Sequence, residues 1–301
     1  MVRIGVVLLP QERWATARTR WQRAEELGFD HAWTYDHLAW RDLADEPWFA
    51  TVPLLAAAAA VTERIGLGTW VASPNFRHPV PFAKDVMGLD DVAGGRFVLG
   101  VGAGGEGWDA GVLGAAPTRG ARTRRFAEFL ALLDTLLTQP VTDHAGEFYQ
   151  AHAARMLPGT LARPRTPFVV AANGPRAMAL AARYGQGWAT YGPGEGVGDG
   201  ADAATAQEEW WAGLARMVDA FDQVPGAADV GRWLSLDGAP RFSLASAALA
   251  VEGVERAAAL GFGDVVVHWP RSSGVYAGDE RELERFADEL PRLQALEPVR
   301  R

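Results

Sequence analysis

The 301-residue chain contains no cysteine. Disulfide bonds, thiolate catalysis and cysteine-ligated metal sites are therefore excluded. Its six histidines are scattered along the chain, and none has the spacing to a second ligand that is typical of a metal site. We therefore expect no bound metal.

Basic residues and long apolar runs are also scarce. Lys and Arg number 29 against 37 Asp and Glu, a net charge of −8, whereas nucleic-acid-binding proteins usually present a basic face. The alanine-rich run from Leu54 to Val61 is too short to span a bilayer. A first strand starting at Arg3 leaves no room for a signal peptide. We expect a cytoplasmic protein with neither a nucleic-acid nor a membrane partner.

Strand-like and helix-like runs alternate eight times along the chain. The strands are expected near residues 3–9, 31–34, 65–72, 96–101, 167–171, 187–190, 232–237 and 263–268. The helices are expected near residues 14–27, 48–62, 79–93, 120–137, 175–185, 203–222, 246–260 and 279–295. This alternation is typical of a parallel sheet, and eight repeats in a chain of this length favour a closed (β/α)8 barrel. We expect one barrel domain over residues 1–301, with residues 141–166 as an insertion.

In such a barrel, the C-terminal ends of the strands and the loops after them form the active site. Here these positions are rich in tryptophan, glycine, histidine and aspartate, which suits a flat, conjugated ligand. For any single tryptophan, core packing is the alternative. The rule selects Leu9-Pro10, Tyr35 to His37, Trp70 to Arg77, Gly102 to Asp109, Asn173 to Arg176, Thr190-Tyr191, and His268 with Trp269.

Asp36 and His37 follow the second expected strand. Histidine titrates near neutrality and can shuttle protons, and a carboxylate can orient it. Because adjacent residues of an extended chain face opposite ways, these two side chains need not touch. The alternative is that Asp36 caps the following turn and His37 packs.

The run from Gly100 to Gly105 matches the dinucleotide fingerprint GxGxxG in form only. That fingerprint must open a helix at once, whereas here an irregular stretch precedes the next helix, near Gly120. The same glycines suit a loop whose backbone, at Gly102, Ala103 and Gly104, approaches a flat ring. Glu106 and Asp109 are the acids of this loop.

The turn from Asn173 to Arg176 is expected to open a helix, with Asn173 or Gly174 as N-cap and Pro175 at the first position. Free backbone N–H groups and the helix dipole make such a turn a phosphate site. The alternative is an ordinary capped helix with Arg176 in solvent.

Taken in order, these motifs resemble the luciferase-like monooxygenase family, whose members use FMN or the deazaflavin F420. The resemblance covers most of the chain, although residues 190–260 match poorly. The matching residues are Ala24 to Asp30, Trp33 with Asp36-His37, Gly68-Thr69, Arg77 to Pro79, Leu89-Asp90, Gly94 to Arg96, Leu99 to Gly104, and Ala171 to Trp188.

The resemblance implies roles for several residues. Members that use F420 carry Asp-His at the position of Asp36-His37, with a tryptophan shortly after, for which Trp40 is the counterpart at a spacing one residue tighter. A non-proline cis peptide behind the deazaflavin ring would fall at Trp70-Val71. A catalytic glutamate lies near Glu106, after a one-residue shift. The family's flavin phosphate binds at the turn that matches Asn173, Gly174, Pro175 and Arg176.

These roles favour an F420-dependent oxidoreductase that transfers a hydride to or from an organic substrate. His37 and Glu106 are the candidates for proton transfer. The substrate pocket would include Trp40, Trp108, Tyr191, His268 and Trp269, although core packing is an equal alternative for His268 and Trp269. Bacterial luciferases proper carry an arginine where Ala103 stands, which weakens a light-emitting role.

Two other functions stay open. One is an FMNH2-dependent monooxygenase served by a separate reductase. The other is a binding barrel without cofactor. The resemblance also implies a homodimer formed through the second and third helices. A small-molecule or peptide-derived substrate is expected, but its identity cannot be read from the sequence.

Overall fold

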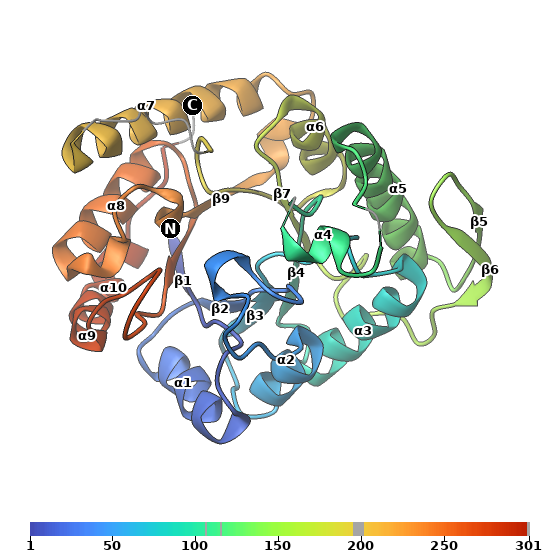
Figure 1. Ribbon diagram of the computed structural model, residues 1–301, viewed down its shortest axis with the longest axis horizontal. Helices are drawn as coiled ribbons and strands as arrows, with labels where there is room; N and C mark the ends of the chain where they lie inside the picture. The colour runs from blue at the N-terminus through green and yellow to red at the C-terminus, as the bar shows by residue number, and fades with distance from the viewer. Residues whose placement is uncertain (106, 115, 195–201, 300–301) are drawn as a thin grey trace. The chain divides into compact units, whose positions relative to one another are not determined.

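The computed structural model describes residues 1–105, 107–114, 116–194 and 202–299. Eight parallel strands are hydrogen-bonded in the order β1-β10-β9-β8-β7-β4-β3-β2 and close into a barrel (Figure 1). The predicted (β/α)8 barrel is thus confirmed. The strands are β1 (Arg3–Val7), β2 (His31–Thr34), β3 (Gly66–Thr69), β4 (Phe97–Val101), β7 (Phe168–Ala171), β8 (Gly187–Thr190), β9 (Gly231–Ser235) and β10 (Asp264–His268).

The helices between the strands lie close to the ranges expected from the sequence. They are α1 (Trp14–Glu26), α2 (Thr51–Ala59), α3 (Pro79–Val92), α4 (Trp108–Gly111), α5 (Arg119–Thr138), α6 (Pro175–Tyr184), α7 (Ala203–Asp222), α8 (Ala247–Ala259), α9 (Glu280–Asp288) and α10 (Leu290–Gln294). Short 3-10 helices are η1 (Arg41–Leu43), η2 (Ala227–Asp229), η3 (Leu236–Gly238) and η4 (Ser243–Ala245). None of the described helices is long and apolar enough to cross a membrane.

Local sequence explains where several helices begin and end. α3 starts after His78, whose ring nitrogen accepts from the Val80 N–H, with Pro79 at the first helical position. The chain then leaves α3 through Gly94 and Gly95, both with positive φ, a conformation that glycine adopts without steric cost. The final helix, expected as one element, is instead divided into α9 and α10. Pro291 lies in the first turn of α10, where its missing N–H is tolerated.

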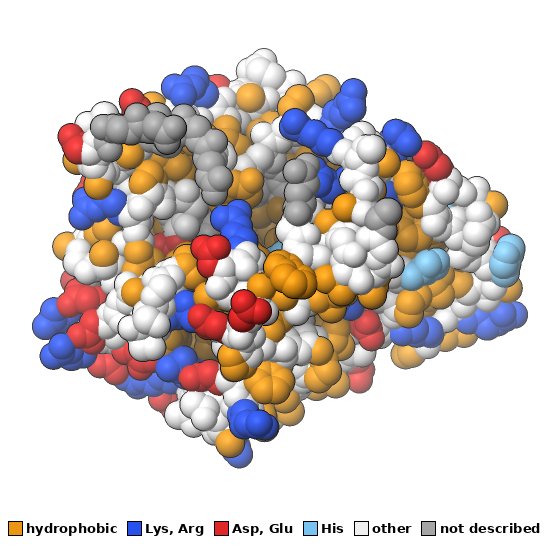
Figure 2. All heavy atoms as spheres, in the orientation of Figure 1, with side chains coloured by type: hydrophobic (Ala, Val, Ile, Leu, Met, Phe, Trp, Pro, Cys, Tyr) orange, Lys and Arg blue, Asp and Glu red, His pale blue; other side chains and the backbone are white. Residues whose placement is uncertain are grey.

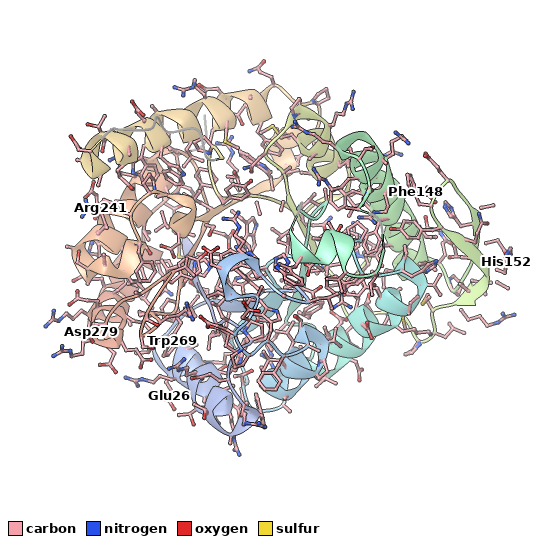
Figure 3. The ribbon with its side chains drawn as sticks, in the orientation of Figure 1. Glu26, Phe148, His152, Arg241, Trp269 and Asp279 are labelled. Carbon is pink, nitrogen blue, oxygen red and sulfur yellow. The ribbon has the colours of Figure 1, made fainter. Side chains whose placement is uncertain are left out.

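The expected insertion at residues 141–166 contains an antiparallel hairpin, β5 (Val141–Ala145) and β6 (Gln150–Arg155). The hairpin is anchored to α5 by Glu128, which accepts hydrogen bonds from the backbone N–H groups of Phe148 and Tyr149 and lies 3.1 Å from His144 Nε2. His152 lies on the side of the hairpin away from α5 (Figure 3).

The chain divides into two compact units. Unit 1 comprises Met1–Leu8, Arg23–Ala32 and Ala172–Arg301, and unit 2 comprises Leu9–Gln22 and Trp33–Ala171. In unit 1, the Trp188 and Phe221 rings stack with centroids 4.2 Å apart. In unit 2, Trp33 lies against the backbone of Gly68, where an added Cβ would come within 2.2 Å of the indole ring. Both cores are aromatic and closely packed. This packing fixes the positions of the strands, and therefore of the polar residues at their ends.

Candidate active site

In unit 2, His37 is held by a carboxylate that is distant in sequence. Its Nδ1 lies 2.5 Å from Oδ2 of Asp109, while Oδ1 of Asp109 accepts from the backbone N–H groups of Leu38 and Ala39 at 2.8 and 3.4 Å. Asp109 is buried, whereas the His37 side chain is 24% exposed. A carboxylate on Nδ1 leaves Nε2 to face a reacting group. Among the described residues, no hydrogen-bond partner of Nε2 is found.

Asp36 points elsewhere, as the alternation of an extended chain predicts. It forms a bidentate pair with Arg77, whose Nε and Nη2 lie 2.7 Å from the two carboxylate oxygens. The side chains are 2% and 13% exposed. Such fork-shaped pairing is strong and directional. It joins the loop after β2 to the loop after β3.

Aromatic rings surround the backbone at His37. Tyr35 makes edge contacts with His37 and Trp40, with ring centroids 5.9 and 5.1 Å away. Trp48 donates its indole N–H to the carbonyl of His37 at 2.8 Å. These contacts fix the backbone position of His37 and bring His37 and Trp40 against the same Tyr35 ring.

The glycine loop after β4 lies against the end of β3. The Trp70-Val71 peptide bond is cis, which confirms the expectation that the resemblance carried. At Gly102, an added Cβ would lie 2.9 Å from Val71 Cγ2, so this approach depends on glycine. At Gly104, φ is +77° and an added Cβ would clash with Asn75. A Cβ added at Gly107 would meet nothing within 4 Å.

One arginine near this loop, Arg125, has unmet capacity for an anion. Arg125 donates to Asn75 Oδ1 at 2.6 Å, but its buried Nε has no hydrogen-bond partner, and neither has the buried hydroxyl of Tyr149. Burial lowers the pKa of Arg125; the nearby Tyr149 opposes that shift and the like charge of Arg122 adds to it. Burial also raises the pKa of Tyr149 to about 12. These donors fit a phosphate, which Arg125 could hold.

In unit 1, the turn before α6 has the predicted form. Gly174 is the N-cap, Pro175 occupies the first turn, and Arg176 is exposed. Asn173 does not cap the helix: its amide donates to the Gly192 carbonyl at 2.9 Å and accepts from Thr190 Oγ1 at 2.8 Å. An added Cβ at Gly174 would meet nothing within 4 Å. The turn therefore has open backbone that suits an anion.

His268 and Trp269 follow a different pattern from the other expected pocket residues. His268 is 1% exposed, its Nδ1 lies 2.8 Å from Asp237 Oδ2, and its ring stacks on Tyr276. Trp269, 7% exposed, donates to Glu280 at 3.0 Å. Their geometry favours the packing alternative. Tyr191, by contrast, is 50% exposed and available to a ligand.

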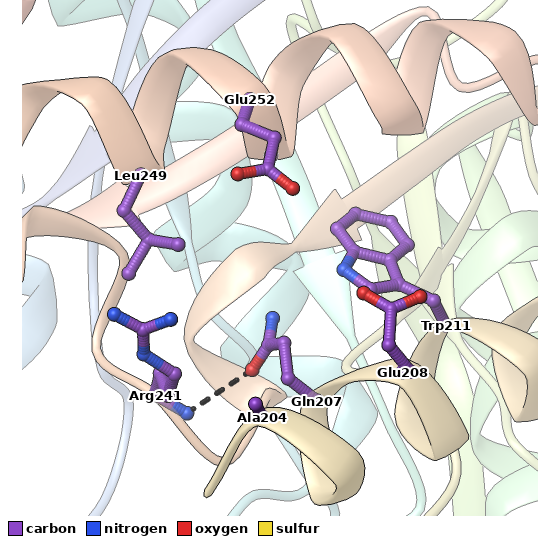
Figure 4. Close-up of a pocket in the computed structure, with 8 residues that line it drawn as sticks. Ala204, Gln207, Glu208, Trp211, Arg241, Leu249 and Glu252 are labelled. Atoms are coloured by element: carbon purple, nitrogen blue, oxygen red, sulfur yellow. Dashed lines mark hydrogen bonds between the residues drawn. The ribbon is translucent and has the colours of Figure 1, made fainter.

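A small cavity of about 120 Å3 lies between α7 and α8 in unit 1 (Figure 4). None of the strand-end residues selected from the sequence lines it. Its lining residues are Ala204, Gln207, Glu208, Trp211, Arg241, Leu249, Glu252 and Gly253. The cavity lies among helices and not at the C-terminal ends of the strands, where barrel enzymes place their active sites. It is therefore not the candidate active site.

Sequence reasoning missed the partners of the two key side chains. Asp109 had been noted only as an acid of the loop, and Arg77 only as a residue at a strand end. No spacing rule links them to His37 and Asp36, because the pairs form across separate βα loops. Glu106, the second catalytic candidate, lies outside the described residues. Within the described residues, no cluster of acidic and histidine side chains could hold a metal ion.

The amino-acid sequence is similar to one protein family and to several characterised proteins. It matches the family described as luciferase-like monooxygenase over residues 2–227. It is 32% identical to an F420-dependent glucose-6-phosphate dehydrogenase of Beutenbergia cavernae, over 91% of this chain and 92% of that protein. It is 35% identical to 4-hydroxyprotoasukamycin monooxygenase of Streptomyces nodosus subsp. asukaensis, over 58% of this chain and 47% of that protein.

The fold is also similar to that of solved structures. The structure of an F420-dependent secondary alcohol dehydrogenase, in complex with an F420-acetone adduct, superposes with a TM-score of 0.73 at 16% identity, over 97% of this chain and 99% of that one. At that identity the likeness establishes the fold alone. The family match over residues 2–227 goes further, and the chain belongs to the luciferase-like monooxygenase family.

Proposed function

We propose that this protein is an F420-dependent oxidoreductase that transfers a hydride between the deazaflavin and an organic substrate. The observation that carries the proposal is the His37 ring after β2, which Asp109 orients through Nδ1 and which is 24% exposed. The names of the F420-dependent relatives support the choice of cofactor.

When bound, F420 supplies the hydride donor or acceptor. The chain's own part is to place the substrate and to move the proton. With Asp109 on Nδ1, His37 Nε2 can take a proton from a substrate hydroxyl or return one to a carbonyl oxygen. Asp109 stabilises the imidazolium that forms and holds the ring in one orientation. Glu106 is retained as a second candidate for proton transfer.

The residues that would hold the cofactor fall into two groups. Asp36, Trp70, Val71, Gly102, Ala103 and Gly104 would contact the ring. Asn173, Gly174, Pro175 and Arg176 would bind its phosphate, with the open backbone at Gly174 in support. Trp40, Trp108 and Tyr191 would contact the substrate.

The test begins with binding. The protein is titrated with F420 and, separately, with FMN, while absorbance and melting temperature are followed. We expect F420 to bind more tightly and F420H2 to be consumed without oxygen. Activity only with FMNH2 and oxygen would replace the proposal with the monooxygenase alternative. The similarity to the monooxygenase of Streptomyces nodosus subsp. asukaensis supports that alternative. If neither cofactor binds, a cofactor-less barrel is the remaining function.

Arg176→Glu tests the phosphate turn, because it places a negative charge at a helix N-terminus. F420 affinity should fall while the melting temperature of the protein alone stays unchanged. Arg183→Glu, at the other end of the same helix, is the matched control. Equal F420 affinity in Arg176→Glu and the wild type would remove this turn from the site.

Three finer points belong to the proposal. The hydrogen-bonded closure of the barrel supports a single domain over residues 1–301, which should unfold in one transition. The family resemblance supports a homodimer, to be checked by light scattering. The cytoplasmic location expected from the sequence is to be checked by cell fractionation.

A further inference from the structure

The cavity between α7 and α8 in unit 1 is lined by residues that the proposed function does not use. Two helices and the loop after β9 form its wall (Figure 4). Its volume of about 120 Å3 is roughly that of four molecules of liquid water. A concave site with an apolar surface and a few converging polar groups is typical of small-molecule binding. The size of this cavity restricts an occupant to a few heavy atoms.

The wall that α7 contributes is held in place by an arginine of α8. Two guanidinium nitrogens of Arg256 lie 2.6 and 2.8 Å from the two carboxylate oxygens of Glu208. The same guanidinium lies over the Trp211 ring, 4.7 Å from its centroid. Trp211 is 5% exposed. Because these side chains are already ordered, a ligand loses little free energy in fixing them.

The charges that line the cavity do not cancel within either side of it. Glu252 lies 3.5 Å from Arg256, so one guanidinium serves the carboxylates of both Glu208 and Glu252, and one negative charge is left over. On the other side, the Arg241 guanidinium has no ion pair with any described residue. Figure 2 shows exposed side chains of both signs where α7 and α8 lie in Figure 1. The cavity therefore has a surplus negative charge on one side and a positive charge on the other.

An amide adds a donor between these charges. The Arg241 backbone N–H donates to Gln207 Oε1 at 3.3 Å, and the amide nitrogen of Gln207 points from α7 toward α8 (Figure 4). No acceptor for this nitrogen is found among the residues that the structure describes. Asp202, the acid that precedes α7, uses its carboxylate to accept from the backbone N–H groups of Ala204 and Thr205. Gln207 and Arg241 are thus the donors that face the cavity.

We propose that this cavity binds a small α-amino acid as its zwitterion. The ammonium group of the ligand donates to Glu252 and Glu208, its carboxylate accepts from Arg241 and the Gln207 amide, and its short side chain contacts Trp211. Hydrogen bonds between charged groups are about twice as strong as neutral ones. An anion alone would face the surplus negative charge, and a cation alone would face Arg241. A molecule of the size of alanine suits the volume.

The experiment compares three molecules of equal size by calorimetry on the full chain. L-Alanine carries both charges, L-lactate only the negative one and L-alaninamide only the positive one. We expect L-alanine to bind about tenfold more tightly than either of the others, because each of these lacks one charged partner for the cavity.

Two substitutions should reverse the preference between the singly charged molecules. Arg241→Gln should weaken L-alanine binding about tenfold and tighten L-alaninamide binding. Glu252→Gln should weaken L-alanine binding similarly and tighten L-lactate binding. Glu255→Gln is the matched control, because Glu255 lies on the same helix but pairs with Arg292 at 2.8 Å and does not line the cavity. Melting temperatures of the variants without ligand should equal that of the wild type.

The outcomes do not depend on the hydride-transfer function, because no F420 is added. Failure of L-alanine to bind, or equal affinity for all three molecules, overturns the inference and leaves the cavity as a solvent-filled gap. Unchanged L-alanine affinity in both Arg241→Gln and Glu252→Gln also overturns it, as does an equal loss in Glu255→Gln. Selective L-alanine binding supports it, whether or not the protein consumes F420H2.

Discussion

Two histidine–aspartate pairs at strand ends differ in what they can do. In unit 2, His37 and Asp109 come from different loops, and the histidine is 24% exposed. In unit 1, His268 and Asp237 are each 1% exposed, and the carboxylate also accepts from the backbone N–H groups of His268 and Ser243. The chemical groups are the same. Exposure alone makes one pair available to a substrate and the other a structural tie.

His37→Ala tests the first pair and has the largest expected effect. A lost general acid or base costs about 10²–10⁴-fold in turnover, so kcat should fall by that order while F420 affinity stays near that of the wild type. Steady-state F420H2 consumption and a binding titration together check this. Normal turnover in His37→Ala with an inactive Glu106→Ala would transfer the role to Glu106.

Asp237→Ala tests the second pair. It leaves the His268 ring and two backbone N–H groups buried without their acceptor, and breaking such a buried pair costs about 3–5 kcal/mol. Urea unfolding should show this loss in the free energy of unfolding. Asp237→Asn keeps an acceptor and should lose less. An Asp237→Ala protein as stable as the wild type would show that the pair does not contribute to the free energy of unfolding.

Asp109→Asn makes the comparison sharper, because it keeps the shape and removes the charge beside His37. The ring loses the partner that orients it, and misplacement of a catalytic group costs up to about 10²-fold. The pH profile of kcat should shift as well, a change that a purely structural role of Asp109 would not produce. Asp134→Asn, which removes the carboxylate charge that pairs with Arg165, is the control for loss of an acidic charge.

Glu128→Gln has the smallest expected effect and concerns a carboxylate remote from both pairs. Partial burial raises the pKa of Glu128, but hydrogen bonds from His144 and the Tyr149 and Phe148 N–H groups outweigh it, and the pKa is lowered from 4.5. A lowered folded-state pKa stabilises the protein above the unfolded value, and this stability is lost as pH falls through the folded value. Wild type should therefore exceed Glu128→Gln by about 1 kcal/mol at neutral pH, and the difference should vanish in acid. Thermal unfolding between neutral pH and pH 3 measures it.

The residue pattern determined more of the fold than of the site. β-branched runs such as Asp264 to His268 alternate with capped helices, and each such signal is local, so the barrel could be predicted strand by strand. The hairpin at residues 141–155 could not, because β5 and β6 are partly exposed and lack a regular apolar alternation. The turn at Asn173 to Arg176 was predictable because its signal is also local: proline and glycine restrict or free the backbone dihedral angles of their own residues.

By itself, the sequence determined the order of the eight barrel strands and of the main helices between them, the family, and the identity of the polar residues that follow each strand. Only the tertiary structure decided which of those residues meet. Asp109 rather than Asp36 holds His37, Arg77 neutralises Asp36, and His268 is sealed under Tyr276. The physical reason is that backbone preferences act over a few residues, whereas these pairings depend on how loops tens of residues apart pack around the strand ends.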